Sequence, residues 1–252
     1  MKKYSFKQMT QAFLMGAFFF TASVFAEDEF LSDEEFFMED LNGGSEISDP
    51  LEFINRYTFE FNDFVYLNLL EPLANAYQTV TPDHVEQGAT NFFRNLGYPV
   101  RLASNVLQGR VRGAWVETGR FAINSTVGLF GVLDPADQMD GFERIPSEDI
   151  GQALGSWGVG EGPYLVLPFL GPSNARDFAG YGVGRVVNPL QEPYTMVSDW
   201  DRELRWGLTA VEFINASPSI LERYERLKGS AIDPYSALKR GYTEFRRGQI
   251  ER

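Results

Sequence analysis

Residues 49–70 read DPLEFINRYTFEFNDFVYLNLL and predict a long first helix. The pair Asp49-Pro50 is typical of a helix start, with the aspartate as N-cap and the proline in the first helical position. At 3.6 residues per turn, one arc of about 160° is apolar; it holds Phe53, Ile54, Tyr57, Phe61, Phe64, Val65 and Leu69. The opposite arc is polar but includes Phe59, Tyr66 and Leu70. A helix that is apolar on both sides is either central to a core or lies in a membrane interface, and the residues leave both open.

Further helices follow, separated by clear stops. Asp83 is a candidate N-cap for a helix that Gly97 ends, and Pro99 starts another helix that runs to residues 108–109. Helical periodicity also predicts helices near residues 111–125, 177–187, 195–215 and 219–228. Asp233-Pro234 repeats the first start signature and opens a C-terminal helix. With no internal repeat and no alternating β-type series, the predicted fold class is mainly α.

Two uncharged runs interrupt this helical pattern, at residues 121–133 and 162–175. Neither reaches the roughly 20 residues that a membrane-spanning helix needs. Three prolines in the second run predict that residues 164–169 are extended or loop-like. The neighbouring glycine-rich stretch, residues 151–171, is expected to form either a tight irregular wall or a hinge.

The chain opens with the pattern of a secretory signal peptide. Three lysines precede the apolar residues 12–20, and Val24-Phe25-Ala26 forms a cleavage site. An uncleaved interfacial anchor is the alternative. Residues 27–49 carry ten acids and no base, which is typical of a solvated spacer. The predicted organisation is a signal peptide at 1–26, an acidic flexible tail at 27–48, a main domain at 49–232 and a basic helix at 233–252.

Composition excludes several classes of chemistry. The formal net charge of −13 disfavours nucleic acid as a partner. The chain has no cysteine and one histidine, His84, so disulfides, cysteine-based zinc sites and thiol nucleophiles are excluded. The glycine clusters at 158–162 and 180–184 lack nucleotide-binding spacing. We therefore expect neither an enzyme nor a cofactor or metal, although acids near Asp134 leave hydrolysis as a remote alternative.

Three blocks of sequence carry a family resemblance. Residues 49–56 (DPLEFINR), 120–136 (RFAINSTVGLFGVLDPA) and 155–172 (GSWGVGEGPYLVLPFLGP), with Arg176-Asp177, resemble the MlaA (VacJ) family in order. The resemblance runs from about residue 49 to residue 235.

This resemblance implies a helical ring embedded in the inner leaflet of the Gram-negative outer membrane. A central amphipathic channel would take phospholipids mislocalised in the outer leaflet and pass them to a periplasmic carrier of the Mla pathway. Association with trimeric porins is also implied. The members of this family are usually lipoproteins, whereas this sequence has no lipobox cysteine, so membrane attachment is expected to come from apolar surface. A soluble periplasmic binding or scaffold protein is the alternative.

The resemblance and the unusual residues together define two candidate sites. The candidate lipid channel and hinge comprises Asn55, Arg56, Phe59, Phe61, Asn62, Gly128, Gly131, Trp157, Gly158, Gly160, Gly162, Tyr164 and Pro168. The candidate carrier-docking residues on the basic helix are Lys239, Arg240, Arg246 and Arg247.

Overall fold

The computed structural model describes residues 47–191 and 201–252, and these are mainly helical, which confirms the predicted fold class. The predicted signal peptide, most of the acidic tail and residues 195–200 of one predicted helix lie outside the described residues. The helices are α4 (Glu52–Val65), the π-helix η1 (Tyr66–Leu70), α5 (Glu71–Val80), α6 (Asp83–Leu96), α7 (Tyr98–Leu107), α8 (Val111–Thr126), the 3-10 helix η2 (Pro135–Gln138), α9 (Ile150–Ser156), α10 (Ala175–Gly184), α11 (Arg202–Ser230) and α12 (Pro234–Glu251). The strands are β1 (Tyr164–Leu167) and β2 (Gly171–Asn174).

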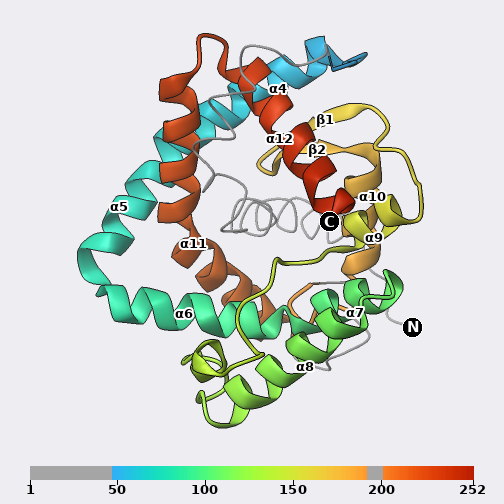
Figure 1. Cartoon of the computed structure of the whole chain (residues 1–252). Helices are drawn as coiled ribbons and strands as arrows, with labels where there is room; N and C mark the ends of the chain where they lie inside the picture. Colours follow the sequence, from blue (N-terminus) through green and yellow to red (C-terminus); the bar gives the residue numbers. More distant parts are fainter. Residues whose placement is uncertain (1–46, 192–200) are drawn as a thin grey trace.

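The helices follow one another around the outline of the molecule (Figure 1). α4, η1 and α5 form one side, α6 runs along the next, and α8, α9 and α10 complete the circuit. α11 returns past α5 and α6, and α12 packs on α9 and β2. No helix among the described residues is both long enough and apolar enough to cross a bilayer.

Helix starts differ from the sequence prediction in two places. α4 begins at Glu52 without a side-chain cap, because the Asp49 carboxylate instead accepts from Asn55 (2.9 Å) and from the Tyr235 hydroxyl. Asp83 is the first residue of α6, and its side chain caps nothing. The third prediction is confirmed, since Asp233 accepts from the backbone N–H of Ser236 at the start of α12.

The prediction of separate helices at 195–215 and 219–228 is wrong where it can be compared, because α11 is continuous through Pro218. Proline has no N–H to donate to the carbonyl four residues earlier, that of Ile214. The Ser217 hydroxyl donates to this carbonyl at 2.7 Å, so the acceptor keeps a partner. Ile220, two residues after the proline, is fully buried, and this packing holds the helix across the proline.

The core lies where α4, η1, α11 and α12 meet a short hairpin. Its buried members are Tyr66, Leu70, Tyr164, Val166, Phe213, Ile220, Tyr224, Leu227, Tyr235, Leu238 and Tyr242. β1 and β2 pair antiparallel, with Tyr164 opposite Asn174 and Leu167 opposite Gly171. The hairpin confirms that residues 164–169 are not helical, and it brings the glycine-rich segment against the first helix.

Candidate functional site

The first helix buries its polar face and exposes its aromatic face. Phe53 is 87%, Tyr57 74% and Phe64 64% exposed, whereas Asn55 and Asn62 are buried, 2% and 3% exposed. A water-soluble helix has the opposite arrangement. The aromatic arc of this helix therefore lies on the surface of the protein and not in its core.

The two buried asparagines hold the hairpin. Asn55 donates to the carbonyl of Tyr164 at 3.0 Å and accepts from the N–H of Val166 at 2.8 Å. Asn62, two turns later, donates to the carbonyl of Leu167 at 2.9 Å and accepts from the N–H of Phe169 at 2.7 Å. Each carboxamide therefore pairs with strand backbone that faces α4, and the polar stripe satisfies groups that would otherwise be buried unpaired.

Arg56 and Phe59 connect α4 to the last two helices. The Arg56 guanidinium pairs with Asp233 at 2.9 Å and lies 4.3 Å above the Tyr235 ring. The hydrogen bond from Arg56 lowers the pKa of Asp233, so this carboxyl stays ionised. Phe59 packs edge-on against Tyr235, with ring centroids 5.9 Å apart. These two predicted site residues therefore hold α4 against the start of α12.

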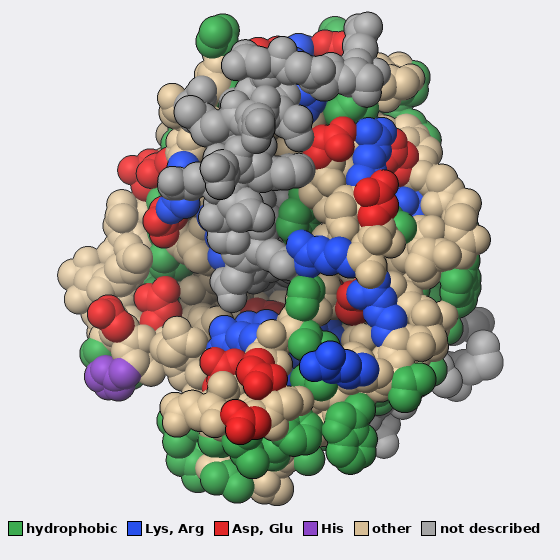
Figure 2. Space-filling model, viewed as in Figure 1, with side chains coloured by type: hydrophobic (Ala, Val, Ile, Leu, Met, Phe, Trp, Pro, Cys, Tyr) green, Lys and Arg blue, Asp and Glu red, His purple; other side chains and the backbone are tan. Residues whose placement is uncertain are grey.

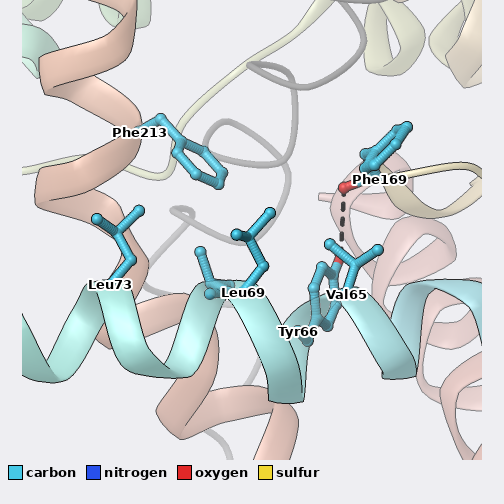
Figure 3. A pocket seen from close by; sticks show the side chains of 7 residues that line it. Val65, Tyr66, Leu69, Leu73, Phe169 and Phe213 are labelled. Carbon is cyan, nitrogen blue, oxygen red and sulfur yellow. Dashed lines mark hydrogen bonds between the residues drawn. The ribbon is translucent and has the colours of Figure 1, made fainter.

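A small apolar pocket lies beside the π-helix. Its walls are Val65, Tyr66, Leu69, Leu70, Leu73, Phe169 and Phe213. Figure 3 shows side chains of η1, α11 and the hairpin turn pointing toward this space, with the Tyr66 hydroxyl donating to the Phe169 carbonyl at 3.3 Å. Phe61 packs edge-on against Phe169 at 5.0 Å. Single π-turns within a helix often mark functional positions.

Phe169 closes the hairpin in a left-handed conformation, with φ of 64°. A non-glycine residue rarely adopts this backbone, and it persists only when surrounding contacts impose it. Here the contacts come from Asn62, Tyr66 and Phe61. The predicted residues of α4 and of the hairpin, including Tyr164 and the exposed turn residue Pro168, therefore belong to one site.

Gly128 and Gly131 lie elsewhere, in the loop after α8, which we call the apolar loop (residues 127–133). In Figure 1 this loop is at the opposite end of the molecule from α4. A Cβ at Gly131, where φ is 94°, would approach the Cβ of Asn95 to 2.5 Å. Leu129 and Phe130 also have positive φ and are exposed, Phe130 by 78%.

Trp157 and the glycines that follow form a third location. The Trp157 ring is exposed, and its Nε1 donates to the carbonyl of Leu107 at 3.0 Å. Gly158 and Gly162 have positive φ, and Gly160 has open space where a Cβ would stand. The structure thus distributes the predicted channel residues over three regions instead of one cluster.

Exposed apolar side chains extend around the molecule. They come from α4, α6, α8, the apolar loop, the segment after α9, α10 and α11: Phe53, Ile54, Tyr57, Phe64, Val85, Val111, Trp115, Val127, Leu129, Phe130, Val132, Leu133, Trp157, Val159, Phe178, Val183, Leu204 and Val211. In Figure 2 hydrophobic side chains gather at the lower and right edges, whereas many charged side chains lie around the middle of the face in view. We call this set the apolar perimeter. Exposed apolar side chains that gather into patches mark membrane or protein interaction sites.

The basic helix α12 corrects part of the docking prediction. The Arg246 guanidinium is buried, 2.6 Å from Asp149 and 2.9 Å from Asp177, so it is not a surface charge. Lys239 is largely buried beside Asp49, at 3.4 Å. Arg247 is partly exposed and pairs with Glu161 and Glu244. Sequence alone did not reveal that acids from α9 and α10 would fold onto this helix.

The acids near Asp134 form ion pairs instead of an acid–base dyad. Arg120 holds Asp134 at 2.6 Å, Arg144 holds it at 3.0 Å, and Asn124 donates to it at 2.7 Å. Although burial opposes the change, these contacts lower the pKa of Asp134. No group of three acids or His within the described ranges is placed to hold a metal ion.

Sequence reasoning missed a small polar pocket between α6, α7 and α8. It is lined by Asn91, Arg94, Asn95, Arg101, Glu117, Arg120, Phe121, Asn124, Asp134 and Ile145. The signal for this pocket in the sequence was the set of asparagines and arginines on amphipathic helices. Helical periodicity does not reveal which of these residues face one another.

The sequence model of the family described as MlaA lipoprotein matches residues 47–249, which include the helices, the hairpin and the glycine-rich turns described above. The chain belongs to the MlaA family. The "Intermembrane phospholipid transport system lipoprotein MlaA" of Escherichia coli K12 is 31% identical over 202 residues, which are 77% of this chain and 75% of that protein.

Other members of the MlaA family give consistent matches. An uncharacterised protein of Rickettsia felis is 32% identical over 213 residues, 83% of this chain and 81% of its own length. A chain solved in work on the "structural basis for maintenance of bacterial outer membrane lipid asymmetry" matches with a TM-score of 0.68 and 29% identity, and covers 81% of this chain and 100% of its own. The fold is therefore that of the MlaA family over most of its length.

Proposed function

We propose that this protein moves phospholipids at the outer membrane of a Gram-negative bacterium and thereby maintains lipid asymmetry. The observation that carries the proposal is the apolar perimeter, since it surrounds a fold whose relatives are named for intermembrane phospholipid transport. Burial of exposed apolar area in lipid is favourable by about 25 cal/mol per Å². The aromatic arc of α4 and the apolar loop would hold the molecule in one leaflet without a spanning helix.

In this proposal the helices form a ring around an amphipathic channel. Phospholipids mislocalised in the outer leaflet enter the channel, and the apolar pocket beside η1 accepts acyl-chain carbons. The hairpin held by Asn55 and Asn62 borders this path, because its turn supplies one wall of that pocket. Binding and release then require no bond to be made or broken, so the protein acts as a transporter component and not as an enzyme.

The partners that we propose are a trimeric porin and a periplasmic carrier of the Mla pathway. Docking to the carrier now rests on Arg240 and Arg247, since Arg246 and Lys239 have structural roles. We place the protein on the periplasmic side of the outer membrane, attached through its apolar surface.

A host strain that lacks its own family member tests the proposal. Expression of the full chain should restore detergent resistance and lower the phospholipid content of the outer leaflet, measured by an outer-leaflet acyltransferase assay. The triple change Phe53→Ser, Tyr57→Ser and Phe64→Ser should abolish this rescue and move protein from the membrane pellet to the soluble fraction, whereas Asn68→Ala, on the same helix, should not.

Two results would contradict the proposal. Wild-type protein that purifies from periplasmic extract without detergent would favour the soluble scaffold. Expression at normal abundance in the membrane without any change in outer-leaflet phospholipid would exclude lipid transport itself.

A further inference from the structure

The apolar loop contains two strained residues with large apolar side chains. Leu129 and Phe130 both have positive φ, 54° and 60°. Their side chains are 62% and 78% exposed, so neither gains much from packing against the rest of the protein. Glycine or asparagine would adopt these left-handed conformations at a lower cost. Backbone strain of this kind clusters at functional positions, and folding alone gives no reason for leucine and phenylalanine here.

The loop is fixed in this shape by hydrogen bonds within the protein. Backbone carbonyls of residues 123–129 accept from the N–H groups of Val127, Gly128, Phe130, Gly131, Val132 and Leu133. From α6, Asn91 donates to the carbonyl of Val132 at 3.3 Å and Asn95 donates to that of Phe130 at 3.5 Å. Irregular backbone is tolerated at membrane depth only where its polar groups have partners within the protein. The apolar loop meets this requirement over most of its length.

The outer face of α8 continues the surface of the apolar loop without an exposed charge. Between residues 113 and 133 the charged residues are Glu117 and Arg120, and both are buried. Thr118 and Thr126 are exposed, but each hydroxyl donates to a carbonyl of its own helix at 2.7 Å. A hydroxyl in hydrocarbon needs such a partner, because water is absent there. The loop lies at the lower end of the molecule in Figure 1, where Figure 2 shows hydrophobic side chains gathered.

We infer that Leu129 and Phe130 form a tip that enters the acyl-chain region of the membrane, in a conformation that costs the fold stability. The inference rests on the proposed function and names the residues through which this end of the molecule contacts lipid. Transfer of both side chains into hydrocarbon is favourable and offsets the strain. Because the loop is fixed beforehand, contact requires little further ordering. A protein partner would cover the same side chains, but this face offers such a partner few hydrogen-bonding groups.

The first test measures the depth of the tip in a bilayer. The chain has no cysteine, so the single change Phe130→Cys can be labelled selectively with a polarity-sensitive fluorophore. The labelled full chain is bound to vesicles of phosphatidylethanolamine and phosphatidylglycerol that carry a quencher on either the headgroup or the acyl chain. The emission should shift to the blue, and the acyl-chain quencher should reduce it more than the headgroup quencher does. Gln138→Cys, at an exposed position of η2, is the matched control and should not respond to the acyl-chain quencher.

The second test measures the cost of the tip, with the double variant Leu129→Asn and Phe130→Asn. Asparagine tolerates the left-handed conformation, so the melting temperature in detergent should rise by about 2–4 °C. Binding to the same vesicles should fall by about tenfold or more, because two apolar side chains are lost from the contact. Val127→Asn is the matched control. Its φ is −72°, so the change should weaken binding without raising the melting temperature.

A probe at residue 130 that the acyl-chain quencher does not reach in vesicle-bound protein would overturn the inference. So would a probe that becomes shielded only after a porin is added to the vesicles, because the tip would then contact protein. A double variant that melts no higher than wild type, or binds vesicles as tightly, would contradict the exchange of stability for lipid contact. Wild-type protein that does not bind the vesicles would refute the proposed function, whereas bound protein with its tip in water refutes this inference alone.

Discussion

Replacement of Asn62 by alanine should release the hairpin from the first helix. The buried carboxamide makes two bonds, one of 2.9 Å to the Leu167 carbonyl and one of 2.7 Å from the Phe169 N–H. The Leu167 carbonyl keeps a second donor, the N–H of Leu170 at 3.1 Å, so only one hydrogen bond is lost there. The Phe169 N–H loses the acceptor that Asn62 provides. The two lost hydrogen bonds together cost about 1–3 kcal/mol of unfolding free energy.

Denaturant unfolding in detergent measures this loss, and hydrogen exchange over residues 164–174 locates it. Asn68→Ala is the control, because Asn68 is exposed and, among the described residues, its side chain bonds only to the carbonyl of Phe64 four residues earlier, at 2.8 Å. The control should change stability by less than about 0.5 kcal/mol. A loss below about 1 kcal/mol for Asn62→Ala, or unchanged exchange in the hairpin, would refute the role given to this side chain.

Three further outcomes are expected. Gly131→Ala should destabilise the fold by about 1–3 kcal/mol, since φ is 94° and space is lacking, whereas Gly160→Ala should have almost no effect; thermal unfolding of both variants compares them. Although burial raises the pKa of Asp177, contact with two arginines lowers it to about 2 from 3.8. The ionised carboxylate therefore contributes about 2 kcal/mol to the free energy of unfolding above pH 4, and this contribution is lost as pH falls through 2. Unfolding measured against pH should show this slope, and Asp177→Asn should remove it. Deletion of Glu60-Phe61 rotates every following residue of the helix by about 200° and should disturb outer-membrane permeability with protein still made; normal detergent resistance at normal abundance would contradict this.

Local patterns predicted the helices well because caps, prolines and glycine stops act on neighbouring residues. Gly97 ends α6, and Asp233 caps α12 as its sequence indicates. Asp49 was assigned wrongly, since its carboxylate pairs with a tyrosine 186 residues later in the chain. Separate helices near 195–215 and 219–228 were predicted, but α11 continues through Pro218, where the Ser217 hydroxyl donates to the Ile214 carbonyl that the proline cannot reach.

The candidate site was predictable only in part for a related reason. The periodicity of α4 identified its apolar arc but not the direction in which that arc faces. Asn55 and Asn62 were named through a family resemblance, yet their partners are backbone groups more than 100 residues away. Arg246 was read as a surface charge because its burial depends on Asp149 and Asp177, which come from other helices. Contacts between distant segments are set by packing and not by spacing along the chain.

The reversed polarity of α4 has a consequence for how the chain tolerates substitution. In most helices the aliphatic and aromatic positions are the intolerant ones, and polar positions vary freely. Here the buried asparagines make the specific contacts with the hairpin, while Phe53, Tyr57 and Phe64 are largely exposed. A saturation library of this helix should therefore accept Leu, Met or Trp at the aromatic positions and almost nothing at Asn55 or Asn62. An engineered water-soluble version would begin by changing the former and leaving the latter untouched.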